Sequence, residues 1–553
     1  MAKTTYSIKV LKAFAELYLK YGSLRAVAKK QRITYHDARD MVLAAVEKGI
    51  LDRSQVSSDN QGALVKHSGR VKAMQPKVMD APVKGGVKRY LLTCAQNNTK
   101  VHEQFWENLQ ALAAHYSAEI MVSRQTYIKR NYGAADKIVA IRGKGLYDTV
   151  IEWDERLEPF FSDERVQLAN GLMWCGEMNI IPTASNPLSG LETYTGRKSG
   201  IFPHTKIAMH SIASGKGEGT KFNYTTGAVT QRNYIARKAG LKAEFHHTYG
   251  AALVEVDGDG DWFVRQINAD STGTIYDLDL QVKHGTVSNG HRPKAILHGD
   301  IHVIEIDKVV ENTIWGTGGL MDSLKPMEQH MGDILTHRGR SHHSIKDPLE
   351  MFKYHLDGSE NVRNEVDITA QFLVRSSRPW CKTVVVDSNH HHHLARWLKE
   401  QDGRKDPVNA EFWIAMSRRI YGRMRNTLKE PNYLWEAFEE VGYDLKHIKF
   451  LEQDESYVIC KDASGGIECG MHGDLGPNGS RGSIKAFARM GRKANVGHSH
   501  IAGIHDGIYQ AGTCSGMDLD WVRGPSAWSH SAVLTYQNGK RTILTMWKKK
   551  WKA

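Results

Sequence analysis

The sequence predicts a multidomain α/β protein, and three observations carry this prediction. The chain has 553 residues, far more than one hydrophobic core needs, so roughly two to four domains are expected. Short apolar runs typical of buried strands alternate with amphipathic segments at helical spacing, which is the pattern of α/β units. Residues 8–50, in contrast, show helical periodicity alone. We therefore expect regions of different architecture along the chain.

Residues 1–53 are predicted to form a module of three helices. Gly22 is suited to end the first helix, Ser23 to cap the second, and Thr34 with Asp37 forms a capping box that opens the third. Two short helices joined by a tight turn beside basic residues resemble a helix-turn-helix, and a helical docking or oligomerisation module is the alternative. The candidate DNA-binding residues are Arg25, Lys29, Lys30, Arg32 and His36.

Residues 54–86 are predicted to be a linker because they are rich in Ser, Asn, Gly, Pro and Lys. Residues 87–290 are predicted to form a β-rich α+β domain that begins with a β-α-β unit and contacts DNA.

Residues 197–238 interleave basic and aromatic side chains, which suits a nucleic-acid surface; a solvated face over a β core is the alternative. Asp257, Asp259 and Asp261 have the spacing of a calcium loop, but the loop's final Glu is missing, so a hairpin turn is favoured.

Net charge and cysteine content bear on the partner and on the compartment of the protein. The formal net charge is +13, which fits either an anionic partner or a solvated basic surface. The six cysteines are scattered and form no CxxC pair, as expected of a cytoplasmic chain. No run approaches the ~20 apolar residues of a membrane span, and the amino terminus lacks the apolar core of a signal peptide. We therefore expect a cytoplasmic protein with no membrane partner.

The stretch 293–303, PKAILHGDIHV, contains the first candidate site. The apolar run from Ala295 to Leu297 reads as a buried strand that delivers Asp300 and His302 to its carboxyl end. Two side chains at this spacing on an extended strand point the same way and can converge on one cation. Alone the pair is a weak signal, because a capped turn explains it more simply.

Further polar clusters follow strand-like or Gly-rich segments downstream. They are Asp333 after Gly332, Asn389 and His390 after a Val run, His472 in MHGD, and His498 with His500 in GHSH. In this order and at these wide spacings, the motifs resemble those of the calcineurin-like metallophosphoesterase superfamily. The resemblance covers the last half of the chain. It implies a catalytic domain over residues 291–553, built as an α/β/β/α sandwich of two mixed sheets.

The resemblance further implies two divalent ions roughly 3.5 to 4 Å apart, which activate water and hold the phosphate oxygens. His390 matches the catalytic histidine of the superfamily, which protonates the leaving oxygen. Oxygen and imidazole ligands without a thiolate favour Mn²⁺, with Mg²⁺ and Fe²⁺ as alternatives. The implied ligands are Asp300, His302 and His500 for the first ion, Asn389, His472 and His498 for the second, and Asp333 as the bridge between them.

Three features depart from the superfamily's pattern. The motif after Asp333 lacks its usual second aspartate, so Asp307 and Asp367 are alternatives for the bridging role. Ser388 replaces a Gly, and a histidine stands at 391 where an acidic residue is common, which leaves the partner of His390 open. The run of four histidines, 390–393, looks like a purification tag, but its place inside the chain after a Val run argues against one. His391 and His337 are the alternatives for the catalytic role.

The whole chain is also similar to the early proteins of T5-like bacteriophages that take part in degrading host DNA. This similarity implies a metal-dependent deoxyribonuclease in the cytoplasm of the infected host cell, with DNA as its partner. It leaves open a homo-oligomer and contacts with other phage early proteins. A phosphoprotein phosphatase or a small nucleotide phosphodiesterase would use the same metal centre, because fold does not determine substrate. A DNA-binding scaffold is the alternative that is not an enzyme.

Overall fold

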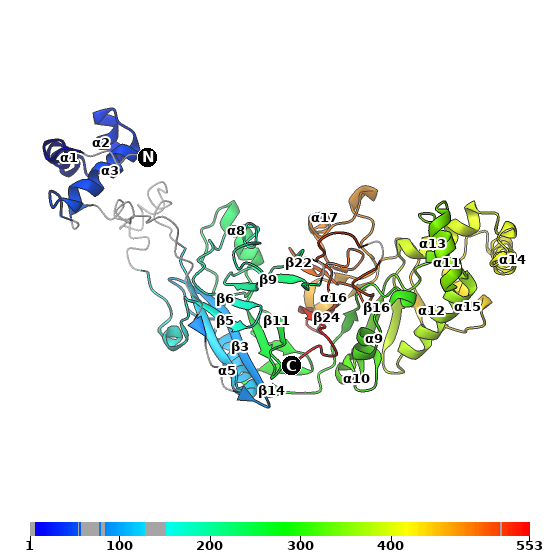
Figure 1. The fold of residues 1–553 in the computed structure, drawn as a ribbon. Helices are drawn as coiled ribbons and strands as arrows, with labels where there is room; N and C mark the ends of the chain where they lie inside the picture. The colour runs from blue at the N-terminus through cyan, green and yellow to red at the C-terminus, as the bar shows by residue number, and fades with distance from the viewer. Residues whose placement is uncertain are drawn as a thin grey trace. The chain divides into compact units, whose positions relative to one another are not determined.

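The computed structural model of the chain describes residues 6–52, 55–56, 77–78, 83–127, 151–215, 217–519 and 522–553. The chain divides into two compact units, Met1–Gln75 and Pro76–Ala553 (Figure 1). Several sheets covered by helices make up the second unit, so the predicted multidomain α/β class is confirmed. The predicted linker 54–86 lies mostly outside the described residues, and so does the side chain of His36.

The first unit is the predicted module of three helices. Gly22 has a φ of 66°, a left-handed conformation that suits glycine, and it ends the first helix. Ser23 caps the second helix by accepting a hydrogen bond from Ala26 N at 3.3 Å. Thr34 and Asp37 form the reciprocal capping box at 3.1 and 3.2 Å. The helices are α1 (Ile8–Tyr21), α2 (Leu24–Gln31) and α3 (Tyr35–Glu47).

The second unit opens with the predicted β-α-β arrangement. Strand β3 (Val87–Gln96) leads through α5 (Glu103–Tyr116) to β4 (Glu119–Gln125), which pairs with β3 in parallel. Strands β10 (Gly250–Val256) and β11 (Trp262–Asn268) extend this sheet as an antiparallel hairpin. Short β2 (Val83–Lys84) pairs on the other side of β3.

The turn of the β10–β11 hairpin carries the three aspartates with calcium-loop spacing. Lys550 Nζ lies 2.7 Å from Asp257 Oδ2 and from Asp259 Oδ2, and Lys548 Nζ lies 2.9 Å from Asp261 Oδ1. Two lysines of the carboxyl-terminal segment therefore neutralise these carboxylates. The hairpin turn favoured from the sequence is confirmed.

An eleven-stranded sheet runs across the second unit in the order β1-β5-β6-β7-β9-β8-β22-β23-β21-β20-β19. It joins residues 165–225 to residues 458–510 through antiparallel pairing of Met209 with Ile504 and His210 with Gly503. The regions predicted as 87–290 and 291–553 thus share one sheet. Its strands are β1 (Lys77–Val78), β5 (Arg165–Ala169), β6 (Leu172–Cys175), β7 (Ser199–Phe202), β8 (Met209–Ile212), β9 (Lys221–Thr225), β19 (Val458–Ile459), β20 (Ile467–Glu468), β21 (Lys493–Val496), β22 (Gly503–His505) and β23 (Ile508–Gln510).

A six-stranded sheet, in the order β18-β17-β16-β15-β24-β25, forms the second large layer. Its first four strands are parallel, β24 pairs antiparallel with β15, and β25 pairs antiparallel with β24. Parallel neighbours end at the same edge, which is where α/β proteins place ligands. The strands are β15 (Ala295–Leu297), β16 (Glu328–Met331), β17 (Lys382–Val385), β18 (Lys449–Phe450), β24 (Ser531–Thr535) and β25 (Arg541–Thr545). A separate small sheet holds β12 (Ile275–Asp277), β13 (Leu280–Lys283) and β14 (Thr286–Ser288).

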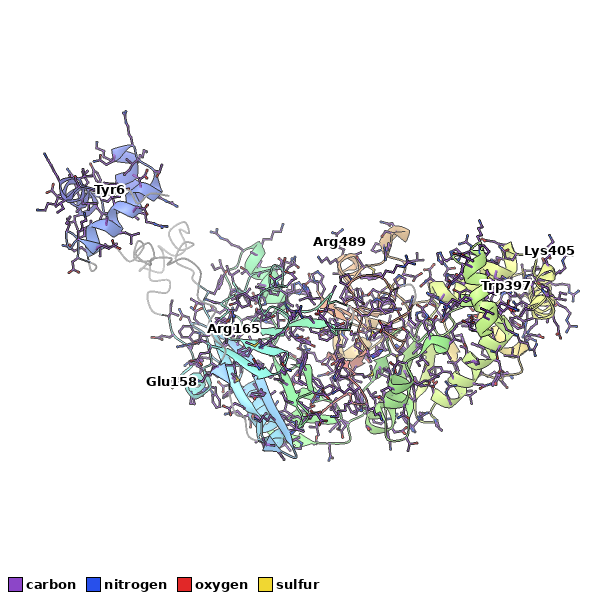
Figure 2. The ribbon with its side chains drawn as sticks, in the orientation of Figure 1. Tyr6, Glu158, Arg165, Trp397, Lys405 and Arg489 are labelled. Atoms are coloured by element: carbon purple, nitrogen blue, oxygen red, sulfur yellow. The ribbon has the colours of Figure 1, made fainter. Side chains whose placement is uncertain are left out.

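Helices cover one face of the six-stranded sheet, and the sheets pack on each other at the opposite face. The largest apolar core lies under the helices, with Ile296 of β15, Val366 and Trp397 among its members; Trp397 is marked in Figure 2. A second core joins Leu297 of the six-stranded sheet to Ile504 of the eleven-stranded sheet. The helices are α9 (Lys308–Trp315), α10 (Leu320–Leu324), α11 (Pro348–Asp357), α12 (Val362–Ser376), α13 (Asn389–Glu400), α14 (Ala410–Thr427) and α15 (Tyr433–Glu440). Elsewhere lie α8 (Lys238–His246), α16 (Lys461–Ser464) and α17 (Ile484–Phe487).

Residues 197–238, predicted as a possible nucleic-acid surface, place two of their aromatic rings in the core of the sheet instead. Phe202 and Tyr224 are buried, at 0% and 2% exposure, so their rings are not available to stack on bases. Lys206 pairs with Asp506, and the Lys221 ammonium donates to two backbone carbonyls, one of them Gly196 O at 2.8 Å. Arg197, Arg232, Arg237 and Lys238 are exposed, so contact of this stretch with DNA phosphates stays a prediction.

Helix α13 begins earlier than the sequence indicated. The sequence predicts a helix over residues 395–400, but the run from Asn389 to His393 already forms the first turn of α13, which ends at Glu400. Successive residues of a helix point about 100° apart, so the four histidines lie in different surroundings. Among the described residues, no helix is long and apolar enough to span a bilayer.

Candidate metal centre

The predicted ligands lie at the carboxyl ends of strands from both large sheets. Asp300 follows β15, Asp333 follows β16 and Asn389 follows β17, which are adjacent parallel strands. His472 follows β20, and His498 with His500 follows β21, in the other sheet. The packing of the two sheets brings these ends together.

Several of these residues adopt the left-handed backbone conformation, which is uncommon outside glycine. The φ angles are 46° at His302, 46° at Asp333, 72° at His498 and 59° at His500. Such conformations cost free energy and cluster at functional sites, where the surrounding structure maintains them. The sharp backbone turns aim polar side chains inward immediately after each strand.

One group of side chains lies around Asp300, His302 and His500. His500 Nε2 is 3.2 Å from Asp300 Oδ2, and His302 Nε2 is 3.3 Å from His500 Nε2. His302 Nε2 is also 3.6 Å from Asp333 Oδ2. Nitrogen lone pairs that face each other at this distance repel unless a proton or a cation lies between them.

A second group lies around His472 and His498. His472 Nε2 is 3.1 Å from Asp333 Oδ2, and the rings of His472 and His498 have centroids 5.3 Å apart. Each group offers three potential ligand atoms, one per residue, that lie within 4.8 Å of one another. The residues are His302, Asp333 and His500 in the first group and Asp333, His472 and His498 in the second. Asp333 therefore belongs to both groups, in the position of a bridge.

Two glycines allow the ligands to approach the backbone. A Cβ atom at Gly497 would lie 2.4 Å from Asp300 Oδ1, and one at Gly332 would lie 2.7 Å from His472 Nδ1. Real Cβ atoms do not approach other atoms so closely. Gly497, within GHSH, is thus required by the space that Asp300 occupies.

The electrostatics of the site favour positive charge. Burial alone would lower the pKa of His472, but the carboxylates of Asp333 and Asp300 raise it to about 10. Burial would raise the pKa of Asp333, yet the imidazoles of His472 and His390 hold it well below its usual range. Burial lowers the pKa of His302 well below its usual range, which leaves its imidazole neutral. His302 and the ionised carboxylates are thus in the forms that bind metal, whereas His472 holds a proton that a bound cation would displace.

Buried donor atoms without hydrogen-bond partners complete the fit to cations. Among the described residues, Asp333 Oδ1, Asn389 Oδ1, His498 Nδ1 and His500 Nδ1 are buried and have no such partner. Buried polar atoms are normally satisfied, and metal coordination is one way to satisfy them. The donor set of carboxylate, amide and imidazole suits divalent ions such as Mn²⁺, Mg²⁺ or Fe²⁺.

His390 lies beside this centre and is oriented by a backbone carbonyl. Its Nδ1 lies 3.1 Å from Thr336 O, and its ring centroid lies 4.7 Å from that of His302. A carbonyl only accepts, so the Nδ1 proton is donated to Thr336 and Nε2 is left for a ligand. The partner of His390 that the sequence left open is therefore a main-chain atom.

The alternatives considered for these roles have other functions in the fold. Asp307 caps α9 by accepting from Val309 N at 2.8 Å, and Asp367, on α12, accepts from Gln371 at 2.7 Å. His391 Nε2 accepts a hydrogen bond from Ile334 N at 3.2 Å. His337 is fully buried against Trp397.

Supporting residues that the sequence did not reveal surround the centre. The carboxylate of Glu365 accepts hydrogen bonds from Thr336 N and His337 N, at 3.1 and 2.6 Å, and so fixes the loop that orients His390. Burial raises the pKa of Glu365 to about 7. Trp528 lies against His500, with ring centroids 4.1 Å apart. No motif marks these residues, because only the fold brings them to the site.

The candidate DNA-binding side chains lie in the separate first unit. Arg25, Lys29 and Lys30 are exposed on α2, and Arg32 is exposed in the turn that follows. The first turn of α3 carries Asp37, which is engaged in its capping box. Four exposed basic residues thus lie on α2 and the turn that follows it.

We expect Gly497→Ala to lower metal affinity by at least tenfold, because the added Cβ displaces the Asp300 carboxylate. Metal content after dialysis measures this effect. Gly422→Ala is the matched control: the position is on α14 with no atom within 4 Å of an added Cβ, so it should bind metal normally. Equal metal content in both variants would show that the Gly497–Asp300 approach does not matter.

Together, the fold and the site define an α/β protein with a buried aspartate–histidine centre suited to divalent cations. No family model and no solved structure matches the chain. The chain is 34% identical over 468 residues to Protein A1 of Escherichia phage T5, an alignment that covers 83% of this chain and 81% of that protein. The chain therefore belongs to the family of the phage T5 protein A1.

Proposed function

We propose that the protein is a metal-dependent deoxyribonuclease that hydrolyses DNA phosphodiester bonds at a centre with two ions, and that it degrades host DNA in the cytoplasm of the infected cell. The observation that supports this most is the pair of buried ligand groups that share Asp333. The relationship to a phage T5 protein supports a role during infection.

The residues divide into those that hold ions and those that act on the substrate. Asp300, His302 and His500 would hold one ion and Asn389, His472 and His498 the other, with Asp333 shared. When bound, the ions supply an activated water and positive charge for the phosphate oxygens. His390, with Nδ1 engaged by Thr336 O, presents Nε2 to protonate the leaving oxygen. Glu365 keeps Thr336 in place for that role.

DNA is favoured over a small diester because of the charge of the chain. The net charge of +13 and the exposed basic residues of α2 suit a polyanion better than a mononucleotide. The module that carries these residues is a compact unit by itself, separate from the unit that carries the metal centre.

The direct test incubates the purified protein with circular duplex DNA, linear duplex DNA, single-stranded DNA, a small phosphodiester and a phosphopeptide. Each substrate is combined with Mn²⁺, Mg²⁺ or a chelator. We expect DNA cleavage that requires metal and is absent from Asp333→Asn. Cleavage of the small diester alone would indicate a nucleotide phosphodiesterase instead of a deoxyribonuclease. Release of phosphate from the peptide would indicate a phosphatase. Binding of DNA without cleavage of any substrate would indicate a scaffold.

DNA affinity should fall steeply with salt, because lysine and arginine contacts release counterions from the phosphates. Replacing Arg25, Lys29, Lys30 and Arg32 together by Gln should reduce the slope of log K against log salt by about 0.9 for each lost phosphate contact. Binding isotherms at several salt concentrations measure this slope.

The matched control for this set replaces Lys9, Lys12 and Lys20, which are exposed on α1 of the same module. This variant should retain the wild-type slope. If wild-type affinity hardly changes between low and physiological salt, binding through basic surfaces is wrong. If the two variants reduce the slope of log K against log salt by the same amount per replaced residue, the basic residues of α2 have no special role in DNA binding.

A further inference from the structure

A second cluster of histidines lies outside the centre described above. It consists of His342 and His343, between the 3₁₀ turn Arg338–Arg340 and α11, and His393 on α13. One ring nitrogen from each lies within 4.8 Å of those of the other two. The ring centroids of His342 and His343 are 3.8 Å apart, and those of His342 and His393 are 4.9 Å apart. We refer to these three residues as the outer histidine cluster.

Two nitrogens of the outer histidine cluster are buried without a hydrogen-bond partner, namely His342 Nδ1 and His393 Nδ1. The side chain of His393 is itself nine-tenths buried. An unsatisfied buried ring nitrogen costs free energy, and a cation bound among the rings would supply the missing partner for both nitrogens. Burial lowers the pKa of His342, and burial together with the neighbouring His390 lowers that of His393 to about 3, so both rings are neutral.

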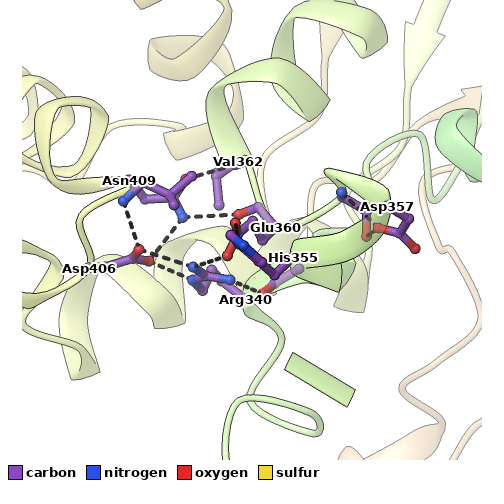
Figure 3. Close-up of polar contacts among 10 residues, drawn as sticks. Arg340, His355, Asp357, Glu360, Val362, Asp406 and Asn409 are labelled. Carbon is purple, nitrogen blue, oxygen red and sulfur yellow. Dashed lines mark hydrogen bonds and ion pairs between the residues drawn. The ribbon is translucent and has the colours of Figure 1, made fainter. Parts of the chain in front are cut away.

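A rigid anchor holds the segment that carries two of these histidines. Arg340, two residues before His342, is buried and forms ion pairs with Asp406 at 2.5 Å and Glu360 at 3.3 Å (Figure 3). Asn409 donates to Glu360 O at 3.0 Å and to Asp406 Oδ2 at 2.9 Å, which ties the segment to the start of α14. The rings of His342 and His343 are therefore presented to α13 from a supported backbone.

We propose that the outer histidine cluster is a third cation site, which binds one ion of the class that prefers imidazole, such as Zn²⁺. Three imidazoles with an open fourth position form a known arrangement for zinc, with Zn–N distances of about 2.0–2.1 Å. The exposed His343 leaves that fourth position to water. Zinc, copper and nickel favour imidazole, whereas Mn²⁺ and Mg²⁺ favour oxygen donors, so the cluster differs in preference from the centre around Asp333.

The charged neighbours of this site act in opposite directions. Arg396 disfavours positive charge at His342, whereas Glu400 favours it. The two side chains form an ion pair at 2.8 Å, which partly offsets the charge of Arg396. The site also lies next to the catalytic candidate, since the rings of His390 and His393 have centroids 4.8 Å apart. An ion there would couple the segment after Arg340 to the turn of α13 that carries His390.

The test compares zinc binding by the wild-type protein, the double variant His342→Ala, His343→Ala, and His447→Ala. His447 is an exposed histidine outside the clusters found among the described residues. We expect zinc to bind at the centre around Asp333 as well, so the difference between proteins isolates the outer histidine cluster. We expect wild type and His447→Ala to bind one more zinc ion per chain than the double variant, at micromolar zinc. With Mn²⁺ the three proteins should bind equal numbers of ions.

Equal zinc stoichiometry in all three proteins would overturn the proposal, and so would an extra ion that binds only at millimolar zinc. His343→Ala, at an exposed position, serves if the double variant unfolds, and thermal unfolding curves decide which variant to use. Anomalous scattering from crystals at the zinc edge then places the ion: a peak among the three rings supports the site, and a loaded Asp333 centre with no such peak contradicts it. Neither outcome depends on whether the protein cleaves DNA.

Discussion

Asp333→Asn is expected to abolish DNA cleavage and to empty both ion positions. The side chain belongs to both ligand groups, and Oδ2 lies 3.1 Å from His472 and 3.6 Å from His302. Replacing the carboxylate by an amide removes the negative charge that two cations would share. Loss of a residue that only hydrogen-bonds to a metal ligand lowers metal affinity or activity by about 10–100-fold. Loss of a ligand that two ions share should therefore lower the rate by more than ~10²-fold. Metal content and turnover of the same preparation measure both effects.

Asp367→Asn is the control for this prediction. The sequence left Asp367 as an alternative to Asp333 for the bridging role. In the structure Asp367 is on α12 and accepts a hydrogen bond from Gln371, which an amide oxygen would also accept. Its variant should retain metal and activity. If Asp333→Asn keeps both ions, or if Asp367→Asn loses them, the assignment of the bridge is wrong.

His390→Asn should separate chemistry from assembly. If His390 protonates the leaving oxygen, its loss should lower the rate by ~10² to 10⁴-fold while the ions and DNA affinity remain. The geometry supports this, because Nδ1 is committed to Thr336 O and the ring lies at the side of His302, outside both ligand groups. Asp300→Asn and His500→Asn should instead lose metal together with activity.

His392→Asn is the matched control on the same helical turn. His392 pairs with Asp387 at 2.8 Å, away from the ligand groups, so its variant should cleave DNA at close to the wild-type rate. Loss of an ion from His390→Asn would show that the histidine is a ligand. The catalytic role would then pass to His391 or His337, although the structure gives both of them buried positions.

Local signals in the sequence were sufficient for the elements whose ends are determined by nearby residues. The three helices of the first unit begin at Ser7, Ser23 and Thr34, whose side chains cap the helix that follows. Strands β15 and β17 were also visible as short apolar runs before polar residues. Caps and apolar runs involve residues close in sequence, which is why they can be predicted without the fold.

Long-range pairing could not be predicted in the same way. The eleven-stranded sheet joins Met209 to Ile504 across nearly 300 residues, and no local pattern encodes that partner. Phe202 and Tyr224 are buried because they lie in strands of this sheet. Their spacing in the sequence does not reveal that pairing, and for this reason it suggested a surface. The start of α13 was missed because histidines have weak helix propensity and the turn is maintained by tertiary contacts, such as that of His391 with Ile334 N.

The motifs indicated which side chains to consider for the site but not how they meet. Asp307, Asp333 and Asp367 were all candidates for the bridge, and only the carboxyl end of β16 lies beside the histidines that follow β20 and β21. The carbonyl of Thr336 has no sequence signature, because every residue carries one. A backbone partner such as this one is found only from the folded chain.

Anomalous scattering from crystals soaked in Mn²⁺ shows directly whether Asp333 joins two cation positions. We expect two peaks roughly 3.5 to 4 Å apart, one beside Asp300, His302 and His500 and the other beside Asn389, His472 and His498, with the Asp333 carboxylate in contact with both. A single peak, or peaks that do not contact Asp333, would contradict it.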